Sequence, residues 1–158
     1  MRFALSTAGL ATVSFSGMAM AGTINVTDQI DRWYGEHYWQ MTDASSNIVA
    51  SASGITYTGS FDYFSSASNP SGDIWGSVFL GMTLANGTYN VQMQDSYGDG
   101  WAWGSFVGGL YVTGDVSAAA GASMPGSAAS FSFTVVPAPG AMALLGLAGL
   151  AARRRRRD

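Results

Sequence analysis

The sequence contains no cysteine, no lysine and a single histidine, His37. Without cysteine the folded chain has no disulfide, so its hydrophobic core must stabilise it. A bound metal as a further source of stability is left open. Between residues 22 and 136 there are eight aspartates, one glutamate and one arginine, a net charge of −8 with His37 neutral. Such an acidic body repels phosphate backbones, which excludes nucleic acid as a partner. It favours solubility and cation capture instead.

Motifs for catalysis are also missing. The sequence has no nucleophile elbow, no phosphate-binding loop and no His/Cys metal spacing. Glu36 with Asp95 or Asp99 would supply the two acids of a glycosidase, but an acid-rich domain offers such pairs by chance. His37 alternates with Trp39, which indicates a packed strand face rather than a catalytic pair. We therefore expect a protein that is not an enzyme.

Positive charge is concentrated at the C-terminus, where five of the seven basic residues form one run. Residues 136–158 contain a Pro-x-Pro segment, the apolar stretch 140–152 and the arginines 153–157, in that order. Proline cannot continue a helix upstream, and a helix over 140–152 covers about 20 Å of a bilayer core about 30 Å thick. Arginines beside a membrane segment stay in the cytoplasm. The order predicts an insertion-and-stop signal, against the alternative of a buried helix with a basic tail.

The tail Val136-Pro137-Ala138-Pro139-Gly140, with the apolar stretch and the arginines, resembles a PEP-CTERM protein-sorting signal. Such signals direct exported bacterial proteins to a membrane-embedded exosortase, which is thought to cut near the Pro-x-Pro and to release or re-anchor the ectodomain. The family's glutamate between the prolines is Ala138 here, a departure that bears on the identity of the processing enzyme. The residues that carry over as the sorting signal are Pro137, Pro139, Gly140, Arg153, Arg154, Arg155, Arg156 and Arg157.

This resemblance implies partners and a location. The partners are export machinery, an exosortase-like enzyme, the membrane before processing and, as an open expectation, exopolysaccharide. The implied route is an inner-membrane-anchored precursor that becomes a cell-surface or extracellular protein. The implied role is structural, in the surface or extracellular matrix.

The N-terminus predicts export as well. Residues 1–21 contain Arg2, a mostly apolar stretch from 3 to 18, and Ala19-Met20-Ala21 as an A-x-A cleavage site. We expect a cleaved signal peptide, with Gly22 as the first mature residue.

The body, residues 22–135, is predicted to be all-β, because apolar residues alternate with period two. Tyr89, Val91 and Met93 fall on one face of one such segment. The expected strands lie at 23–27, 36–41, 48–52, 55–59, 74–82, 87–94, 106–112 and 130–135, and 114–129 is expected to be a loose connection. Asn86-Gly87 and Asp99-Gly100 are turn dipeptides. These features predict one antiparallel β-sandwich or jelly-roll-like domain, between an N-terminal signal helix and a C-terminal apolar helix.

Residues 95–101, DSYGDGW, resemble a motif of many secreted bacterial β-modules. In those modules it follows a G-T-Y-x-V strand, as 87–91 does here, and an upstream E-x-x-W-x-L strand resembles 36–41. The segment SFSFTV, 130–135, resembles their closing strand. The resemblance spans roughly 28–135 and implies a surface or accessory placement, without a biochemical activity.

Two interpretations of DSYGDGW remain open. In the first, Asp99-Gly100 forms a hairpin turn, Asp95 caps the preceding backbone and Trp101 packs below. In the second, Asp95, Asp99 and carbonyl groups around Tyr97 bind calcium, which takes six to eight oxygen ligands, with Glu36 or another acid completing the set.

Trp101 and Trp103 are candidates for stacking on a sugar, because i, i+2 spacing places both on one face of an extended segment. The alternative is that the aromatic residues fill the core. A glycan- or calcium-binding accessory module is therefore the alternative to a structural surface protein.

Overall fold

A computed structural model describes residues 20–68 and 76–137. The predicted signal peptide up to Ala19, and the tail residues Pro139, Gly140 and 153–157, lie outside the described residues, as does the apolar stretch 140–152. Within the described part of the chain, no helix is long and apolar enough to cross a membrane.

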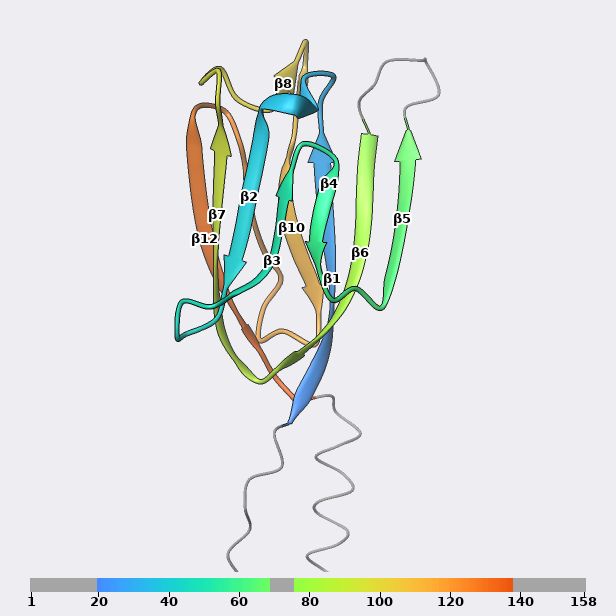
Figure 1. The fold of residues 1–158 in the computed structure, drawn as a ribbon, viewed down its shortest axis with the longest axis vertical. Coiled ribbons are helices and arrows are strands. Elements are labelled where there is room, and N and C mark those ends of the chain that lie inside the picture. The colour runs from blue at the N-terminus through green and yellow to red at the C-terminus, as the bar shows by residue number, and fades with distance from the viewer. Residues whose placement is uncertain (1–19, 69–75, 138–158) are drawn as a thin grey trace, which may run out of the picture.

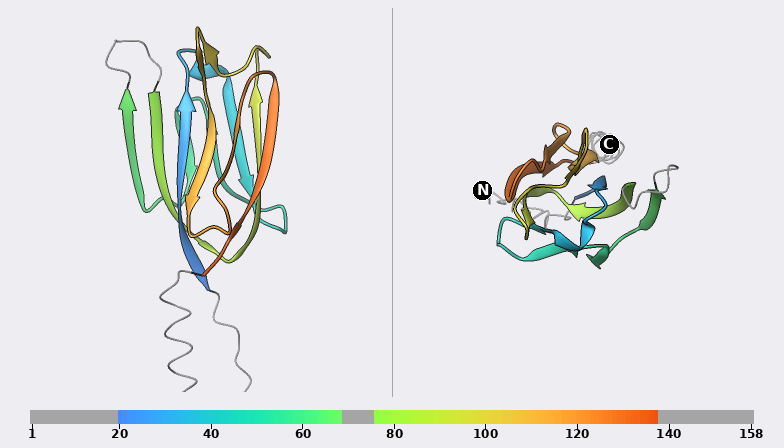
Figure 2. Two further views of the ribbon diagram at one scale, coloured as in Figure 1. Left: turned by 180° about the vertical axis from the view of Figure 1, so that it is seen from behind. Right: turned by 90° about the horizontal axis from the view of Figure 1, so that it is seen from above.

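The described chain is all-β, with two antiparallel five-stranded sheets lying face to face (Figures 1 and 2). The first sheet has the order β11 (Ala120–Ser123), β10 (Gly109–Gly114), β1 (Ala21–Ile30), β6 (Gly76–Ala85), β5 (Tyr63–Ser68). The second has the order β12 (Ala128–Val135), β7 (Gly87–Asp95), β2 (His37–Thr42), β3 (Ile48–Ser53), β4 (Thr56–Gly59). A ribbon of β8 (Ala102–Trp103) and β9 (Phe106–Val107) and the 3₁₀ helix η1 (Tyr34–Glu36) complete the elements.

The core lies between the two sheets and follows the predicted alternation. Tyr89, Val91 and Met93 of β7 are buried, and so are His37 and Trp39 of β2. Their neighbours along each strand are more exposed. Because successive side chains of a strand point to opposite faces, this pattern sets the register that buries one face of each sheet.

Two edge strands, β5 and β11, were not expected from the sequence, and β11 lies inside the segment 114–129 that was predicted to be a loose connection. Neither shows apolar alternation, and each pairs with only one neighbour, β6 or β10. Backbone pairing at a sheet edge needs no apolar face. The sequence pattern therefore carries no signal for these two strands.

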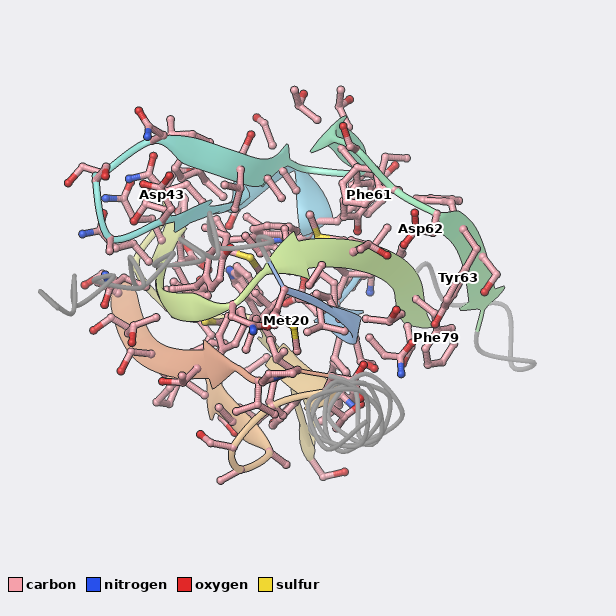
Figure 3. All side chains as sticks on the ribbon, turned by 90° about the horizontal axis from the view of Figure 1, so that it is seen from below. Met20, Asp43, Phe61, Asp62, Tyr63 and Phe79 are labelled. Atoms are coloured by element: carbon pink, nitrogen blue, oxygen red, sulfur yellow. The ribbon has the colours of Figure 1, made fainter. Side chains whose placement is uncertain are left out.

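The sandwich has two chemically different ends, or poles (Figure 1). The acidic pole comprises residues 31–36, between β1 and β2, and residues 95–101, after β7. The terminal pole holds the first and last described residues, Met20 and Pro137, together with Asp115. Figure 3 views the molecule from the terminal pole, with Met20 near the middle and Asp43 and Asp62 farther out.

Candidate functional site

Four carboxyl groups come from two separate segments at the acidic pole. Asp31 follows β1, Glu36 ends η1, Asp95 ends β7 and Asp99 lies in the loop after it. Glu36, Asp95 and Asp99 each place a carboxylate oxygen so that all three oxygens lie within 4.8 Å of one another. The structure thus brings together Asp95 and Asp99, which the sequence singled out, with Glu36, which was expected to complete their set.

The loop after β7 is built by hydrogen bonds to one oxygen of Asp95. Its Oδ1 accepts the backbone N–H groups of Tyr97 at 2.9 Å and Gly98 at 2.7 Å. Asp95 therefore caps the backbone that follows it, whereas the hairpin interpretation expected it to cap the preceding backbone. The N–H of Ser96 donates to the carbonyl of Glu36 at 3.0 Å, which ties the two segments together.

Glycine is required at one position of this loop. Gly100 has a φ of +91°, and a Cβ there would lie 2.5 Å from the carbonyl oxygen of Met124. Both the left-handed backbone and the close approach exclude a side chain. The chain bends at Asp99, but β7 pairs with β12 and β2 and not with β8, so the predicted hairpin at Asp99-Gly100 is not formed. Trp101, which follows Gly100, is directed inward.

Trp101 is fully buried, with 0 % of its surface exposed. Its ring stacks on that of His37, with centroids 4.4 Å apart and planes 15° from parallel, and its backbone N–H donates to the carbonyl of Met124 at 2.8 Å. This corrects the expectation that Trp101 stacks on a sugar, because no ligand can reach it. The backbone of Trp103 lies in β8, and its side chain is not among those that the structure describes.

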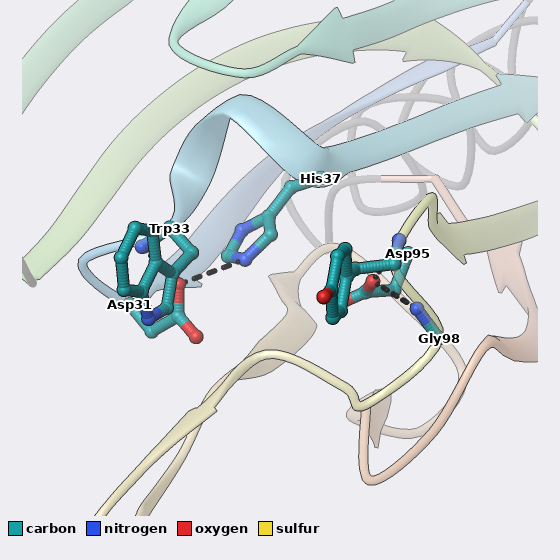
Figure 4. A network of polar contacts seen from close by, with 6 residues as sticks. Asp31, Trp33, His37, Asp95 and Gly98 are labelled. Atoms are coloured by element: carbon teal, nitrogen blue, oxygen red, sulfur yellow. Dashed lines mark hydrogen bonds and ion pairs between the residues drawn. The ribbon is translucent and has the colours of Figure 1, made fainter.

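Asp31 and Asp95 lie on either side of His37 (Figure 4). Asp31 Oδ1 accepts the N–H of Trp33 at 2.7 Å and lies 3.0 Å from His37 Nε2, without the alignment of a hydrogen bond. Burial lowers the pKa of His37 to about 4, and the nearby charge of Asp95 opposes this only in part. His37 is therefore neutral at pH 7 and adds no positive charge to the acidic pole.

The second oxygens of two buried aspartates have no hydrogen-bond partner. Asp95 is 6 % exposed and Asp31 is 1 % exposed, and in each the Oδ2 atom is buried and unpaired. Since an unsatisfied buried oxygen costs free energy, these two atoms mark a place where a ligand would be stabilising.

Negative charge accumulates at the acidic pole. The pKa of Asp31 is raised mainly by burial, and also by the charges of Asp95, Glu36 and Asp99, against a lowering hydrogen bond from Trp33. The pKa of Glu36 is raised by loss of hydration and then by the charges of Asp95 and Asp99. Mutual repulsion of this kind favours binding of a proton or a cation.

Two exposed aromatic side chains flank the acids. Trp33 is 51 % exposed and Tyr97 is 79 % exposed, and together with Glu36 and Asp99 they line an open depression of about 320 Å³. The guanidinium of Arg32 lies 5.2 Å from the ring centroid of Trp33. Sequence reasoning did not assign Asp31 or Trp33 to the site, because only the folding of β1 against β2 places them beside the loop after β7.

The processing residues that the structure describes lie at the terminal pole. Ala21 is the first residue of β1 and pairs with Ala85, Gly22 is buried, and Pro137 follows β12. These positions place the predicted signal cleavage at the very start of the first strand.

No protein-family model, no curated protein and no solved structure matches this chain.

Proposed function

We propose that this chain is an exported bacterial surface or extracellular-matrix protein with a structural, non-catalytic role, sorted by its PEP-CTERM-like tail. The proposal rests on the order of sequence features at the two ends: the A-x-A site before Gly22 and the Pro-x-Pro, apolar and arginine parts of 136–158. The exosortase-like enzyme, the export machinery and the exopolysaccharide remain its proposed partners.

The observation that supports the proposal best is that the first and last described residues of the domain lie together at the terminal pole. The carbonyl of Met20 accepts the N–H of Asn86 at 2.8 Å, and the N–H of Val136 donates to the carbonyl of Asp115 at 2.9 Å. A Cβ on Gly22 would lie 2.6 Å from the carbonyl oxygen of Val136, so the two ends of the domain are in contact. Signals attached to both ends would leave from this pole, and a tethered domain would present its acidic pole away from the tether.

Cleavage after Ala21 is compatible with this packing. It would remove one pair of the β1–β6 ladder and the hydrogen bond between Met20 and Asn86. It would leave the new α-ammonium group of Gly22 beside Asp115, whose carboxylate accepts the N–H of Thr23 at 2.9 Å. An ammonium group beside a carboxylate is favourable. The sandwich would thus keep its closure in the mature protein.

Intact-mass spectrometry of the protein from its native host tests the proposal. We expect a chain that begins near Gly22 and lacks the arginines 153–157. A mature surface protein that keeps these arginines would contradict cleavage and indicate a retained anchor, and one that keeps residues 1–21 would contradict signal-peptide removal. Neutral replacements of the five arginines should reduce retention of the precursor at the inner membrane.

The alternative function is an accessory module that binds a glycan or calcium. Burial of Trp101 removes half of the predicted glycan platform. The acidic pole, in contrast, gains a buried ligand set, which favours a cation over a sugar.

A further inference from the structure

The geometry of the acidic pole points to a calcium site, and we propose that Glu36, Asp95 and Asp99 bind one Ca²⁺ between the two segments that they come from. This goes beyond a structural surface role. It also goes beyond the sequence motif, because Glu36 lies outside DSYGDGW and comes from the other segment.

An acidic cluster alone does not make a site, since exposed carboxylates commonly gather at acidic surfaces. Here a separate observation points to a ligand: Asp31 and Asp95 are buried, and each directs one unpaired oxygen into the protein rather than into water. Their other oxygens are already used, by Trp33 and by Tyr97 and Gly98. A cation bound by Asp95 would satisfy its free oxygen without breaking either of its hydrogen bonds, and the positive charge of the ion would offset the repulsion between this cluster and the buried Asp31.

The chemistry of the ligands fits calcium. All three donors are carboxylates, the hard oxygen ligands that Ca²⁺ takes at 2.3–2.6 Å, so two ligands of one ion can lie up to about 5 Å apart. The oxygens of Glu36, Asp95 and Asp99 lie within 4.8 Å of one another, inside that span. Mg²⁺, at 2.0–2.1 Å, allows only about 4.2 Å and demands octahedral geometry. Calcium also needs further ligands to reach six to eight, and the open side of the depression gives water access for them.

Binding would cross-link the pole. Glu36 immediately precedes β2, and Asp95 is the last residue of β7, so an ion held by both would fasten the paired ends of these strands, where His37 lies opposite Asp95. In a chain without disulfides such a link takes the place of a covalent one.

The test uses the full-length chain, stripped with EDTA and dialysed. Adding Ca²⁺ to a hundred times its Kd should raise the melting temperature by roughly 10 °C, because only the folded state assembles the ligands. Tb³⁺, a luminescent substitute for Ca²⁺, should give emission sensitised by Trp33 and Tyr97, and added Ca²⁺ should quench it by displacement. An unchanged melting temperature together with no Ca²⁺-sensitive emission would overturn the proposal, as would an equal shift with Mg²⁺.

Variants at exposed ligands locate the site without threatening the fold. Glu36→Gln and Asp99→Asn should each weaken Ca²⁺ binding at least tenfold while the EDTA-treated variants still unfold cooperatively. Asp62→Asn is the matched control, since Asp62 is an exposed acid away from the acidic pole whose side chain accepts a hydrogen bond from the Thr83 hydroxyl. If Glu36→Gln and Asp99→Asn bound Ca²⁺ as tightly as the control, the ion would lie elsewhere and the proposed ligand set would be wrong.

Discussion

The two poles of the sandwich close the same pair of sheets in different ways. At the terminal pole, backbone groups satisfy one another: Asp115 N–H donates to Thr23, Val136 N–H to Asp115, and Ser117 N–H to Thr134. At the acidic pole, the atoms Asp31 Oδ2, Asp95 Oδ2, His37 Nδ1 and Trp101 Nε1 are buried without a hydrogen-bond partner. Buried polar groups are normally hydrogen-bonded, so the unpaired atoms of the acidic pole call for an explanation that the terminal pole does not.

The two poles therefore differ in which groups hold the sheets together. The terminal pole needs only backbone pairing, and its side chains contribute little. The acidic pole depends on particular side chains. Some are buried beneath the loop after β7 and others are exposed to solvent. Substitutions at the two poles should therefore differ in size, and the predictions below run from the largest expected effect to the smallest.

The largest effect is expected for Trp101→Ala. The ring is fully buried and stacked on His37, so its removal leaves a cavity beneath the loop after β7. Loss of a buried tryptophan costs about 3–5 kcal/mol of unfolding free energy. Urea unfolding followed by circular dichroism measures it.

Trp33→Ala is the control, because Trp33 is the exposed tryptophan of the same pole. It should cost less than about 1 kcal/mol. Equal costs for the two substitutions would contradict the division between packed and open side chains at the acidic pole.

Trp101 also shows how far the sequence could predict the site. Period-two alternation correctly identified the inward faces of β2 and β7, since that pattern is local. The hairpin interpretation was wrong about the hairpin, because β7 and β8 do not pair, but it correctly placed Trp101 below the loop. The prediction that Trp101 is exposed and stacks on a sugar came from its i, i+2 spacing with Trp103. That spacing does not show which face of a short extended segment packs against the core.

Asp31 could not have been assigned from sequence. Nothing in the run Asp31-Arg32-Trp33 distinguishes a buried acid of the site from an ordinary turn residue, and the place of Asp31 beside the site comes from the packing of β1 against the opposite sheet. The edge strands β5 and β11 were missed for a related reason: their stability comes from backbone pairing with β6 and β10. Features that depend on contacts between distant segments leave no local pattern.

Asp28 is a further buried acid, in the core between the sheets. Its ionisation predicts that the free energy of unfolding depends on pH. Asp28 Oδ2 accepts hydrogen bonds from Trp39 Nε1 at 2.8 Å and from the Tyr57 hydroxyl at 3.0 Å. Burial nevertheless raises the pKa of Asp28 from 3.8 to about 6, outweighing these two bonds. The folded state holds this proton more tightly than the unfolded state, so the stabilising contribution is full below pH 4 and is lost as the pH rises through 6.

Asp28→Asn should remove that dependence. Relative to the wild type, the variant should gain about 2–3 kcal/mol of unfolding free energy between pH 4 and pH 7.5, because two pKa units correspond to roughly that amount. The difference between the two proteins is the quantity to measure, since His37, with its lowered pKa, contributes a slope of opposite sign to both. A difference that stays constant across this pH range would contradict a buried, proton-retaining Asp28.

The smallest effect is expected at the terminal pole, for Asp115→Ala. The side chain of Asp115 accepts one exposed hydrogen bond, from the N–H of Thr23, while its backbone bonds to Thr23 and Val136 do not require a carboxylate. Water can replace the lost acceptor, so the substitution should cost about 0.5–1.5 kcal/mol. Asp115→Asn, which keeps an acceptor, should cost less, and a chain that begins at Gly22 should lose more than the full chain because its α-ammonium group would also lose a partner. Urea unfolding of both chain forms measures these differences, and a cost above about 2 kcal/mol in the full chain would mean that the terminal pole, too, depends on a specific side chain.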